Sequence, residues 1–115
     1  MHELSLCQNI VKQLQVLVEE HDASTVSVVR LKIGPLSGVD PELMQHAFPA
    51  ASAETVASNA VLEIENTPIR VTCQSCGKES EVTTNKLLCT SCGSNKTTLN
   101  SGDEMLLVDV EMTTT

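Results

Sequence analysis

The chain has 115 residues and a formal net charge of −8, a length that fits one domain or one domain with a small appendage. Hydrophobic residues make up 41% of it, which is enough for a modest core and argues against wholesale disorder. Phe48 is the sole aromatic residue, and 15 acidic residues face 7 basic ones. Single-stranded nucleic-acid binders need aromatic faces for stacking and duplex binders need a basic surface, so we expect no nucleic-acid partner.

The sequence also indicates a compartment. No run approaches the roughly 20 apolar residues that span a bilayer, and the N-terminal residues lack the basic and apolar regions of a signal peptide. We therefore expect a cytoplasmic protein without a membrane span, whose thiols are reduced. Five cysteines in such a compartment indicate metal ligation rather than disulfide bonds.

Three segments in the first half of the chain have the periodicity of regular structure. Apolar residues recur at helical spacing over residues 4–21, which predicts an amphipathic helix. Residues 26–33 alternate between apolar and polar, as in a half-buried strand. Asp40 and Pro41 predict the start of a second helix, with Asp40 as its N-cap, and we expect Pro49 to end or kink it.

The second half carries further, weaker signals. Small residues over 50–60 favour a second helical piece, and the alternation over 60–68 predicts a strand. The run 105–112 predicts a third strand, with Asp109 and Glu111 on a solvated face. Its apolar face is predicted to comprise Leu106, Val108, Val110 and Met112.

The segment 69–99 differs from the rest of the chain because it holds four cysteines, many Ser and Thr residues and few large apolar side chains. A segment of this size needs a metal or disulfides to fold. We therefore predict that the chain has two parts: residues 1–68 with 100–115, and an inserted metal-binding domain over 69–99.

The four cysteines form two Cys-x-x-Cys pairs, Cys73 with Cys76 and Cys89 with Cys92. Two such knuckles facing each other supply four thiolates in a tetrahedral cage, the arrangement of a structural zinc site. Four thiolates leave no open position on the metal, so the Zn(II) is predicted to be structural rather than catalytic. The alternatives are iron in the same cage and a pair of redox dithiols, although neither pair has the thioredoxin-like context of a strand followed by a helix.

The N-terminus is a second candidate metal site. The Met1 amine, the His2 amide and the His2 imidazole together close two fused chelate rings, and the amide or carboxylate of Glu3 is a candidate fourth donor. Such a nitrogen-rich, tetragonal set favours Ni(II) or Cu(II). From the residues alone the alternative is that His2 is a solvated terminal side chain.

Three other residues with ligand chemistry have simpler explanations. His21 falls at a helix end, where it suits a cap or a surface position, and His46 is expected to pack next to Phe48. Cys7 lies on the apolar side of the first predicted helix and is expected to be a small core residue.

The whole chain resembles one known family. The resemblance rests on the opening Met-His-Glu-Leu-Ser-Leu-Cys, the stretch Leu-Lys-Ile-Gly-Pro-Leu-Ser-Gly-Val over residues 31–39 and the Cys-x-x-Cys pairs. It extends to Leu-Glu-Ile-Glu over 62–65, Gly-Asp-Glu-Met over 102–105 and Val-Glu-Met over 110–112. In this order these motifs are similar to those of the HypA/HybF family of hydrogenase nickel-incorporation proteins.

The resemblance implies a fold and a function. The fold is α+β, with two helices on a three-stranded mixed sheet and an inserted zinc-ribbon-like subdomain. The function is that of a non-enzymatic nickel metallochaperone for [NiFe]-hydrogenase maturation, in which exchangeable Ni(II) is held by His2 with Met1 and Glu3, and structural zinc by Cys73, Cys76, Cys89 and Cys92. The implied partners are the nickel-handling GTPase HypB and the hydrogenase large-subunit precursor, and a homodimer is left open.

Two other classes of protein remain as alternatives at this stage. A zinc-ribbon adaptor would have the same cysteine cluster and an inert N-terminus, whereas a thiol oxidoreductase would use a Cys-x-x-Cys pair for redox chemistry. Metal content separates them: zinc with a weaker nickel site indicates the chaperone, zinc alone the adaptor, and a metal-free reducible disulfide the enzyme.

Overall fold

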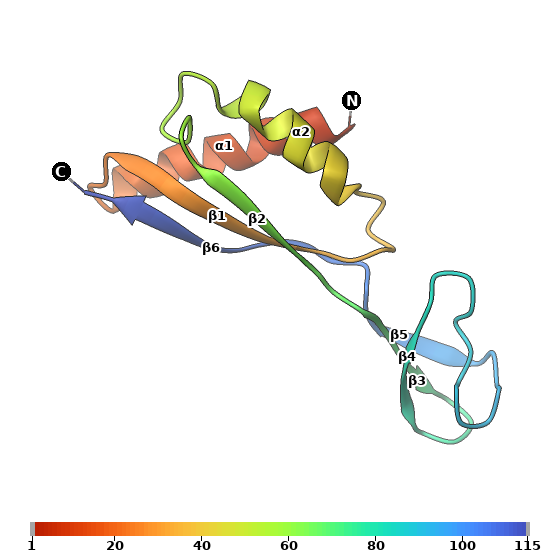
Figure 1. Cartoon of the computed structure of the whole chain (residues 1–115). Helices are drawn as coiled ribbons and strands as arrows, with labels where there is room; N and C mark the ends of the chain where they lie inside the picture. Colours follow the sequence, from red (N-terminus) through yellow and green to blue (C-terminus); the bar gives the residue numbers. More distant parts are fainter. Residues whose placement is uncertain (1, 115) are drawn as a thin grey trace.

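The computed structural model describes residues 2–114, and the side chain of His2 lies outside the described part. The predicted α+β class is confirmed, with two helices on a three-stranded mixed sheet and a second sheet that carries the cysteines (Figure 1). The elements are, in chain order, α1 (His2–Glu20), β1 (Thr25–Ile33), α2 (Pro41–Ser52), β2 (Val61–Asn66), β3 (Ile69–Cys73), β4 (Glu79–Val82), β5 (Thr97–Ser101) and β6 (Met105–Thr113). Among the described residues, no helix combines the length and the apolar composition that a membrane crossing requires.

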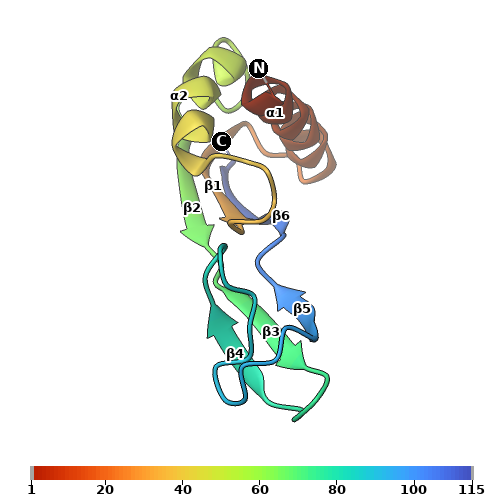
Figure 2. The ribbon, with the colours of Figure 1, turned by 90° about the vertical axis from the view of Figure 1, so that its right-hand side faces the viewer.

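The first sheet has the strand order β2-β1-β6, with β1 parallel to β2 and antiparallel to β6. Both helices lie on one face of this sheet, and the other face is open (Figure 2). We call the helices and this sheet the first lobe. Its core forms because α1 and β1 each present one apolar side, as their periodicities predict. The most deeply buried large side chains of this core are Leu14, Val26, Val29, Leu31, Ile33 and Met44.

The start of α2 is as predicted, but Pro49 does not end the helix. The Asp40 carboxylate accepts hydrogen bonds from the backbone N–H groups of Glu42 and Leu43, so Asp40 is the N-cap and Pro41 occupies the first turn. The helix continues through Pro49 to Ser52. Proline removes one backbone hydrogen bond of a helix, and here that loss falls in the last turn, where buried Phe48 holds the segment against the core.

The predicted second helical piece over 50–60 does not extend past Ser52. Glu54 adopts a positive φ of 60°, which a right-handed helix cannot accommodate. Successive tight turns follow, with the Thr55 N–H donating to the Ser52 carbonyl and the Ser58 N–H to the Thr55 carbonyl. Turns replace the helix because the small side chains of this segment offer little apolar surface to bury.

The predicted apolar face of β6 is wrong in its first half because of a β-bulge. Opposite consecutive residues Arg30 and Leu31 of β1 stand Asp109 and Leu107 of β6, so Val108 is an extra residue without a partner in the pairing. The bulge inverts the alternation, because one added residue turns every earlier side chain to the other face. Leu107 therefore faces the core side with Val110 and Met112, whereas Leu106 and Val108 are 51% and 47% exposed.

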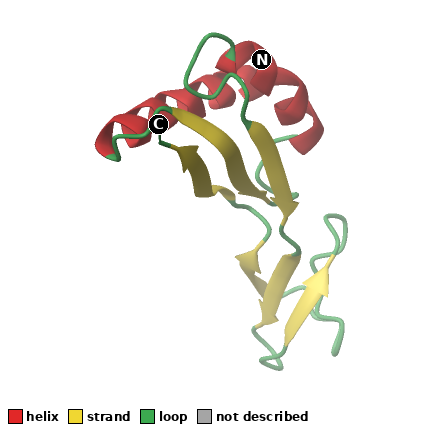
Figure 3. Ribbon diagram, turned by 60° about the vertical axis from the view of Figure 1, so that its left-hand side comes forward, coloured by secondary structure: helices red, strands yellow, loops and turns green. Residues whose placement is uncertain are grey.

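The second sheet belongs to the segment that the sequence marked as different. Its strand order is β4-β3-β5, and β3 is antiparallel to both neighbours. We call this sheet and its loops, residues 69–101, the second lobe. The two lobes together extend over 56 × 28 × 16 Å (Figure 3). Few apolar side chains are buried in the second lobe: Ile69, Val71, Cys73 and Cys89.

The lobes meet where backbone packs directly against backbone. The N–H of Gly34 donates to the Glu104 carbonyl (2.8 Å) and the N–H of Leu36 donates to the Gly102 carbonyl (2.7 Å). A Cβ atom on Gly34 would lie 2.1 Å from the Gly102 carbonyl oxygen, and one on Gly102 would lie 2.9 Å from the Cα of Ile69. The contact therefore requires glycine at both positions.

The Glu104 carboxylate forms hydrogen bonds at the same junction. Glu104 accepts hydrogen bonds from the backbone N–H of Gly102 (2.7 Å) and from the hydroxyl of Thr67 (3.1 Å). Donation by the Gly102 amide lowers the pKa of Glu104 below its ordinary value. Because the folded state favours the ionised carboxylate, this contribution to stability is present at neutral pH and is lost as the pH falls through the lowered pKa.

We predict that Gly34→Ala destabilises the protein by at least about 2 kcal/mol, because the added methyl group must displace the Gly102 backbone. Urea unfolding followed by far-UV circular dichroism measures the effect. Gly38→Ala is the control, since Gly38 has a φ of +79° but no atom within 4 Å of the added Cβ, and should cost about 1 kcal/mol. Equal losses in the two variants would contradict the close approach at the junction.

Candidate metal centres

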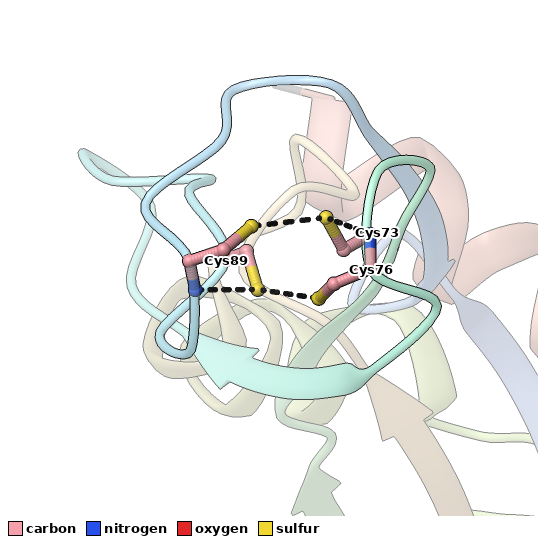
Figure 4. A group of neighbouring side chains, drawn as sticks. Cys73, Cys76 and Cys89 are labelled. Carbon is pink, nitrogen blue, oxygen red and sulfur yellow. Dashed lines mark hydrogen bonds between the residues drawn. The ribbon is translucent and has the colours of Figure 1, made fainter.

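The four cysteines of the two pairs converge at the end of the second lobe. Cys73 is the last residue of β3, Cys76 lies in the turn that follows, and Cys89 and Cys92 come from the loop that precedes β5. Their sulfur atoms all lie within 4.8 Å of one another, and none forms a disulfide bond. The Cys73 and Cys92 sulfurs are 3.5 Å apart, and those of Cys76 and Cys89 are 3.6 Å apart (Figure 4).

The two Cys-x-x-Cys loops have the same local structure. In each loop, the sulfur of the first cysteine accepts hydrogen bonds from the backbone N–H groups of the residues two and three positions later. The distances are 3.3 Å in the first loop and 3.4 Å in the second. The glycine after each pair donates its N–H to the carbonyl of the first cysteine, and both glycines have φ near +78°. These bonds hold the two sulfurs of a pair on one side of a tight loop, which is how a knuckle presents ligands.

The hydrogen bonds give the thiols of the cluster different pKa values. Donation by the Cys92 and Ser91 amides lowers the pKa of Cys89 to about 6, and donation by the Cys76 amide likewise lowers the pKa of Cys73. For Cys92 the largest influence, the Ser94 amide, lowers the pKa, but the neighbouring thiols and desolvation outweigh it and raise the pKa to about 11. A cation between the sulfurs would favour their thiolate forms, because it offsets the repulsion between neighbouring negative charges.

The dimensions of the cluster fit zinc. Four sulfurs placed tetrahedrally at the Zn–S bond length of about 2.3 Å lie about 3.8 Å from one another. The distances of 3.5 and 3.6 Å across the cluster match this spacing and far exceed a disulfide bond. All four predicted ligands are thus brought together, in a set that closes the metal to substrate.

The predicted N-terminal site is described in part. Met1 and the side chain of His2 lie outside the described residues, while the backbone of His2 begins α1. The Glu3 carboxylate accepts a hydrogen bond from the backbone N–H of Asp40 at 3.3 Å. The first turn of α1 therefore lies beside the start of α2, in the first lobe and at a distance from the cysteine cluster (Figure 1).

Two residues near Glu3 were not assigned to this site by sequence reasoning. Asp40 was recognised as a helix cap alone, although its backbone contacts the Glu3 carboxylate. His46 was expected to pack next to Phe48, but it is exposed and lines a groove of about 320 Å³ together with Glu3 and Leu4. The error has a simple cause: residues two apart on a helix point to different sides, so buried Phe48 directs His46 outward.

The remaining candidates have structural roles. Cys7 is fully buried in the core, where its thiol lies 3.7 Å from the Met44 carbonyl, and burial raises its pKa. His21, at the end of α1, donates its Nδ1–H to the Leu17 carbonyl at 3.0 Å. Both agree with the sequence-based expectation of a core cysteine and a histidine at a helix end.

The chain is similar to known proteins over almost its whole length. Residues 1–112 match the family described as hydrogenase/urease nickel incorporation, metallochaperone, hypA. The hydrogenase maturation factor HypA of Nitrosospira multiformis is 46% identical over 115 residues, covering 100% of both chains, and that of Aquifex aeolicus is 38% identical over 112 residues, covering 97% of both. In fold, the chain is similar to the Ni metallochaperone HypA from Helicobacter pylori in solution, with a TM-score of 0.69 and 23% identity over 98% of each chain.

The fold and the cysteine cluster thus define a small α+β metal-binding protein rather than a bare zinc ribbon. The match over almost the whole chain assigns it further: the chain belongs to the HypA family of nickel metallochaperones, which serve nickel incorporation into hydrogenase and urease.

We predict that Cys73→Ser releases the metal of the cluster and unfolds the second lobe, because structural zinc supplies about 10–16 kcal/mol in small zinc-finger peptides. The first lobe should persist, since its core contains no residue of the second lobe. Metal analysis and far-UV circular dichroism measure the two effects.

Cys7→Ser is the matched control for this experiment, because it alters a buried thiol in the first lobe. It should lower the stability of the helices and leave the metal content unchanged. Loss of all helical signal in Cys73→Ser would show that the lobes do not fold separately.

Proposed function

We propose that this protein binds Ni(II) at its N-terminus and delivers it during maturation of a [NiFe]-hydrogenase. The observation that carries the proposal is the full-length match to a nickel metallochaperone family in a chain that opens with Met-His-Glu. The ligands are the Met1 amine, the amide and imidazole of His2, and Glu3. An amine, an amide and an imidazole in consecutive positions form the tetragonal nitrogen set that Ni(II) prefers.

The surroundings of Glu3 support a nickel site that exchanges its metal. The groove that Glu3 lines is shallow and open, with Leu43 and His46 of α2 along its other side. A site at the beginning of a chain has few ligands and is approached readily by a second protein. A metallochaperone needs such access, because it must release the metal that it has bound.

The cysteine cluster has the opposite role in this proposal. Zn(II) bound by Cys73, Cys76, Cys89 and Cys92 stabilises the inserted domain, residues 69–99, and takes no part in nickel transfer. Residues 1–68 and 100–115 form the nickel-binding domain. The presence of two separate sheets, joined by one backbone junction, supports this division.

The proposal includes partners, a compartment and the absence of catalysis. The nickel-handling GTPase HypB and the hydrogenase large-subunit precursor are the partners, with the GTPase as an aid to loading or transfer of the metal. The protein acts in the cytoplasm, where four free thiols remain reduced for zinc binding. It is a carrier and not an enzyme, because its task is to bind and release a metal ion without chemical change.

We predict that two residues added before Met1, such as Gly-Ser, weaken nickel binding at least about tenfold, because the extension converts the ligating amine into an amide. His2→Ala with a native terminus should be comparably damaging. Isothermal titration and absorbance measure both, and the chain has no Trp or Tyr to obscure the nickel bands.

His21→Ala is the matched control, since His21 is exposed at the far end of α1. It should keep native nickel affinity, and all variants should keep their zinc. Native affinity and an unchanged spectrum in the extended protein would show that the amine is not a ligand. Zinc without any nickel binding in the native protein would favour an adaptor instead.

We also predict a pH dependence. The pKa of an ordinary imidazole is about 6.5 and that of an α-amine about 7.8, and each group must be deprotonated to bind metal. Nickel affinity should therefore fall at least about tenfold between about pH 7.5 and pH 5.5, in the direction of proton competition. Zinc content should change much less over this range, and equal nickel affinity at the two pH values would count against terminal ligation.

A further inference from the structure

The two edge strands of the first sheet, β2 and β6, differ in length and in what contacts them. β2 is short, and the side-chain amide of Gln45, from α2, donates to its Leu62 carbonyl at 2.7 Å. β6 is longer, and within residues 2–114 it has a single neighbouring strand, β1. An edge strand presents unpaired backbone donors and acceptors, so β6 offers a template for a further strand.

The pairing with β1 determines which residues of β6 face outward. The Gly34 N–H donates to the Glu104 carbonyl, so Glu104 directs its backbone groups toward β1. Residues of an antiparallel strand alternate in this respect. Met105 and Leu107 therefore direct their N–H and C=O groups away from the sheet, in the stretch that precedes the bulge at Val108.

A groove lies beside this same stretch. It has a volume of about 440 Å³ and lies between α1 and β6, on the helix-covered side of the sheet. Its lining is mostly apolar and includes Leu6, Ile10, Leu31, Met105 and Leu107. Side chains of an added strand alternate between the two faces of a sheet, so every second one would enter the groove and the others would lie on the open face.

The open face of β6 is acidic beyond the bulge, whereas Leu106 and Val108 are exposed on this face beside Met105–Leu107. Asp109 and Glu111 are about half exposed, and β6 contains no basic residue. Arg30 of β1 contacts both of these carboxylates and Glu63 of β2, and Lys32 of β1 contacts Glu65 of β2, so two positive charges face four negative ones. The remaining negative potential favours basic side chains on this face.

The charges on this face also indicate which kind of strand can pair with β6. Antiparallel pairing of two copies through Met105–Leu107 would place Asp109 of each copy opposite Asp103 of the other, in chains that each carry a net charge of −8. Like charges across a strand pair are destabilising. A second copy is therefore disfavoured, and a segment with alternating apolar and basic residues satisfies both the groove and the open face.

We propose that the Met105–Leu107 stretch of β6 is a docking site for an extended segment of a partner protein, which adds a strand to the sheet with apolar side chains in the α1–β6 groove and basic side chains toward Asp109 and Glu111. The bulge at Val108 ends the regular pairing on one side. The paired stretch is short, so side-chain complementarity determines which segments bind. This surface is separate from both candidate metal centres, and its use does not depend on nickel binding.

The test uses the full-length, zinc-loaded protein and a fluorescent peptide, acetyl-Lys-Val-Lys-Val-Lys-Val-Lys-amide, as the probe. Fluorescence anisotropy measures binding, and amide NMR spectra locate it. We expect chemical-shift changes and slower hydrogen exchange at the Met105 and Leu107 amides. Two versions of the peptide, N-methylated at alternate residues, distinguish strand pairing from electrostatic attraction. N-methylation removes backbone N–H donors, so the version methylated on the edge that faces β6 should lose its hydrogen bonds to β6 and its binding.

Two pairs of protein variants test the side-chain contacts. Asp109→Asn with Glu111→Gln should weaken binding about three- to tenfold, whereas Glu63→Gln with Glu65→Gln, which removes the same charge from the far edge, should change it less than twofold. Leu6→Ala should weaken binding about tenfold. Leu4→Ala, its matched control on the side of α1 that faces α2, should leave binding unchanged. Helical circular dichroism verifies that each variant is folded.

Several outcomes would overturn the proposal. They are equal binding of both N-methylated peptides, equal binding of the peptide with Glu in place of Lys, and shifts confined to residues outside α1 and β6. Sedimentation that shows a dimer whose contact maps to Met105 and Leu107 would make a second copy the occupant, contrary to the charge argument. Nickel titrations serve as an independent check, because the β6 variants should retain native nickel affinity.

Discussion

The alternation of side chains along β1 is the constraint on which the first lobe depends. β1 is the central strand, and Val29, Leu31 and Ile33 on one face are almost fully buried beneath the helices. On the other face, Arg30 contacts carboxylates from both neighbouring strands. Burying each of the apolar side chains contributes about 1.5–3 kcal/mol, whereas partly exposed ion pairs contribute at most about 1 kcal/mol each. The apolar face therefore stabilises the lobe, and Arg30 mainly orients β2 and β6 about β1.

The second lobe needs a different source of stability, because it buries few apolar side chains. Ile69 and Val71 are its main buried aliphatic residues, and two of that size contribute about 3–6 kcal/mol, too little to order some thirty residues. A structural zinc ion supplies more than that at once. The backbone N–H groups that point at the Cys73 and Cys89 sulfurs prepare the site for a cation, since they stabilise negative charge before a metal arrives.

Much of this architecture was predictable from residue pattern, because the relevant signals are local. The periodicity of α1 and β1, the Asp40 cap and the two knuckles each depend on residues a few positions apart. The bulge at Val108 was not predictable, because it depends on the register between two strands far apart in the chain. The three strands of the second lobe were likewise missed, since their short polar sequences carry no clear alternation.

The candidate nickel site shows the same limit. A terminal Met-His-Glu motif is visible in the sequence, but its neighbours are not, because the second helix reaches it through tertiary packing. Asp40 and His46 come to lie near Glu3 because α1 and α2 pack side by side. Sequence spacing places His46 and Phe48 close together, while helix geometry separates them and leaves His46 on the exposed groove.

The cysteine cluster and the proposed nickel site differ in the feature that decides how fast a metal leaves. In the cysteine cluster, four candidate ligands come from two loops that the second sheet fixes, so release of a bound metal would require several bonds to break while the protein holds each sulfur in place. At the N-terminus, the proposed ligands belong to consecutive residues at one chain end, where each donor detaches with little cost to the core. In the proposed function the two sites therefore complement each other: the closed site maintains a folded surface, and the terminal site gives up its metal.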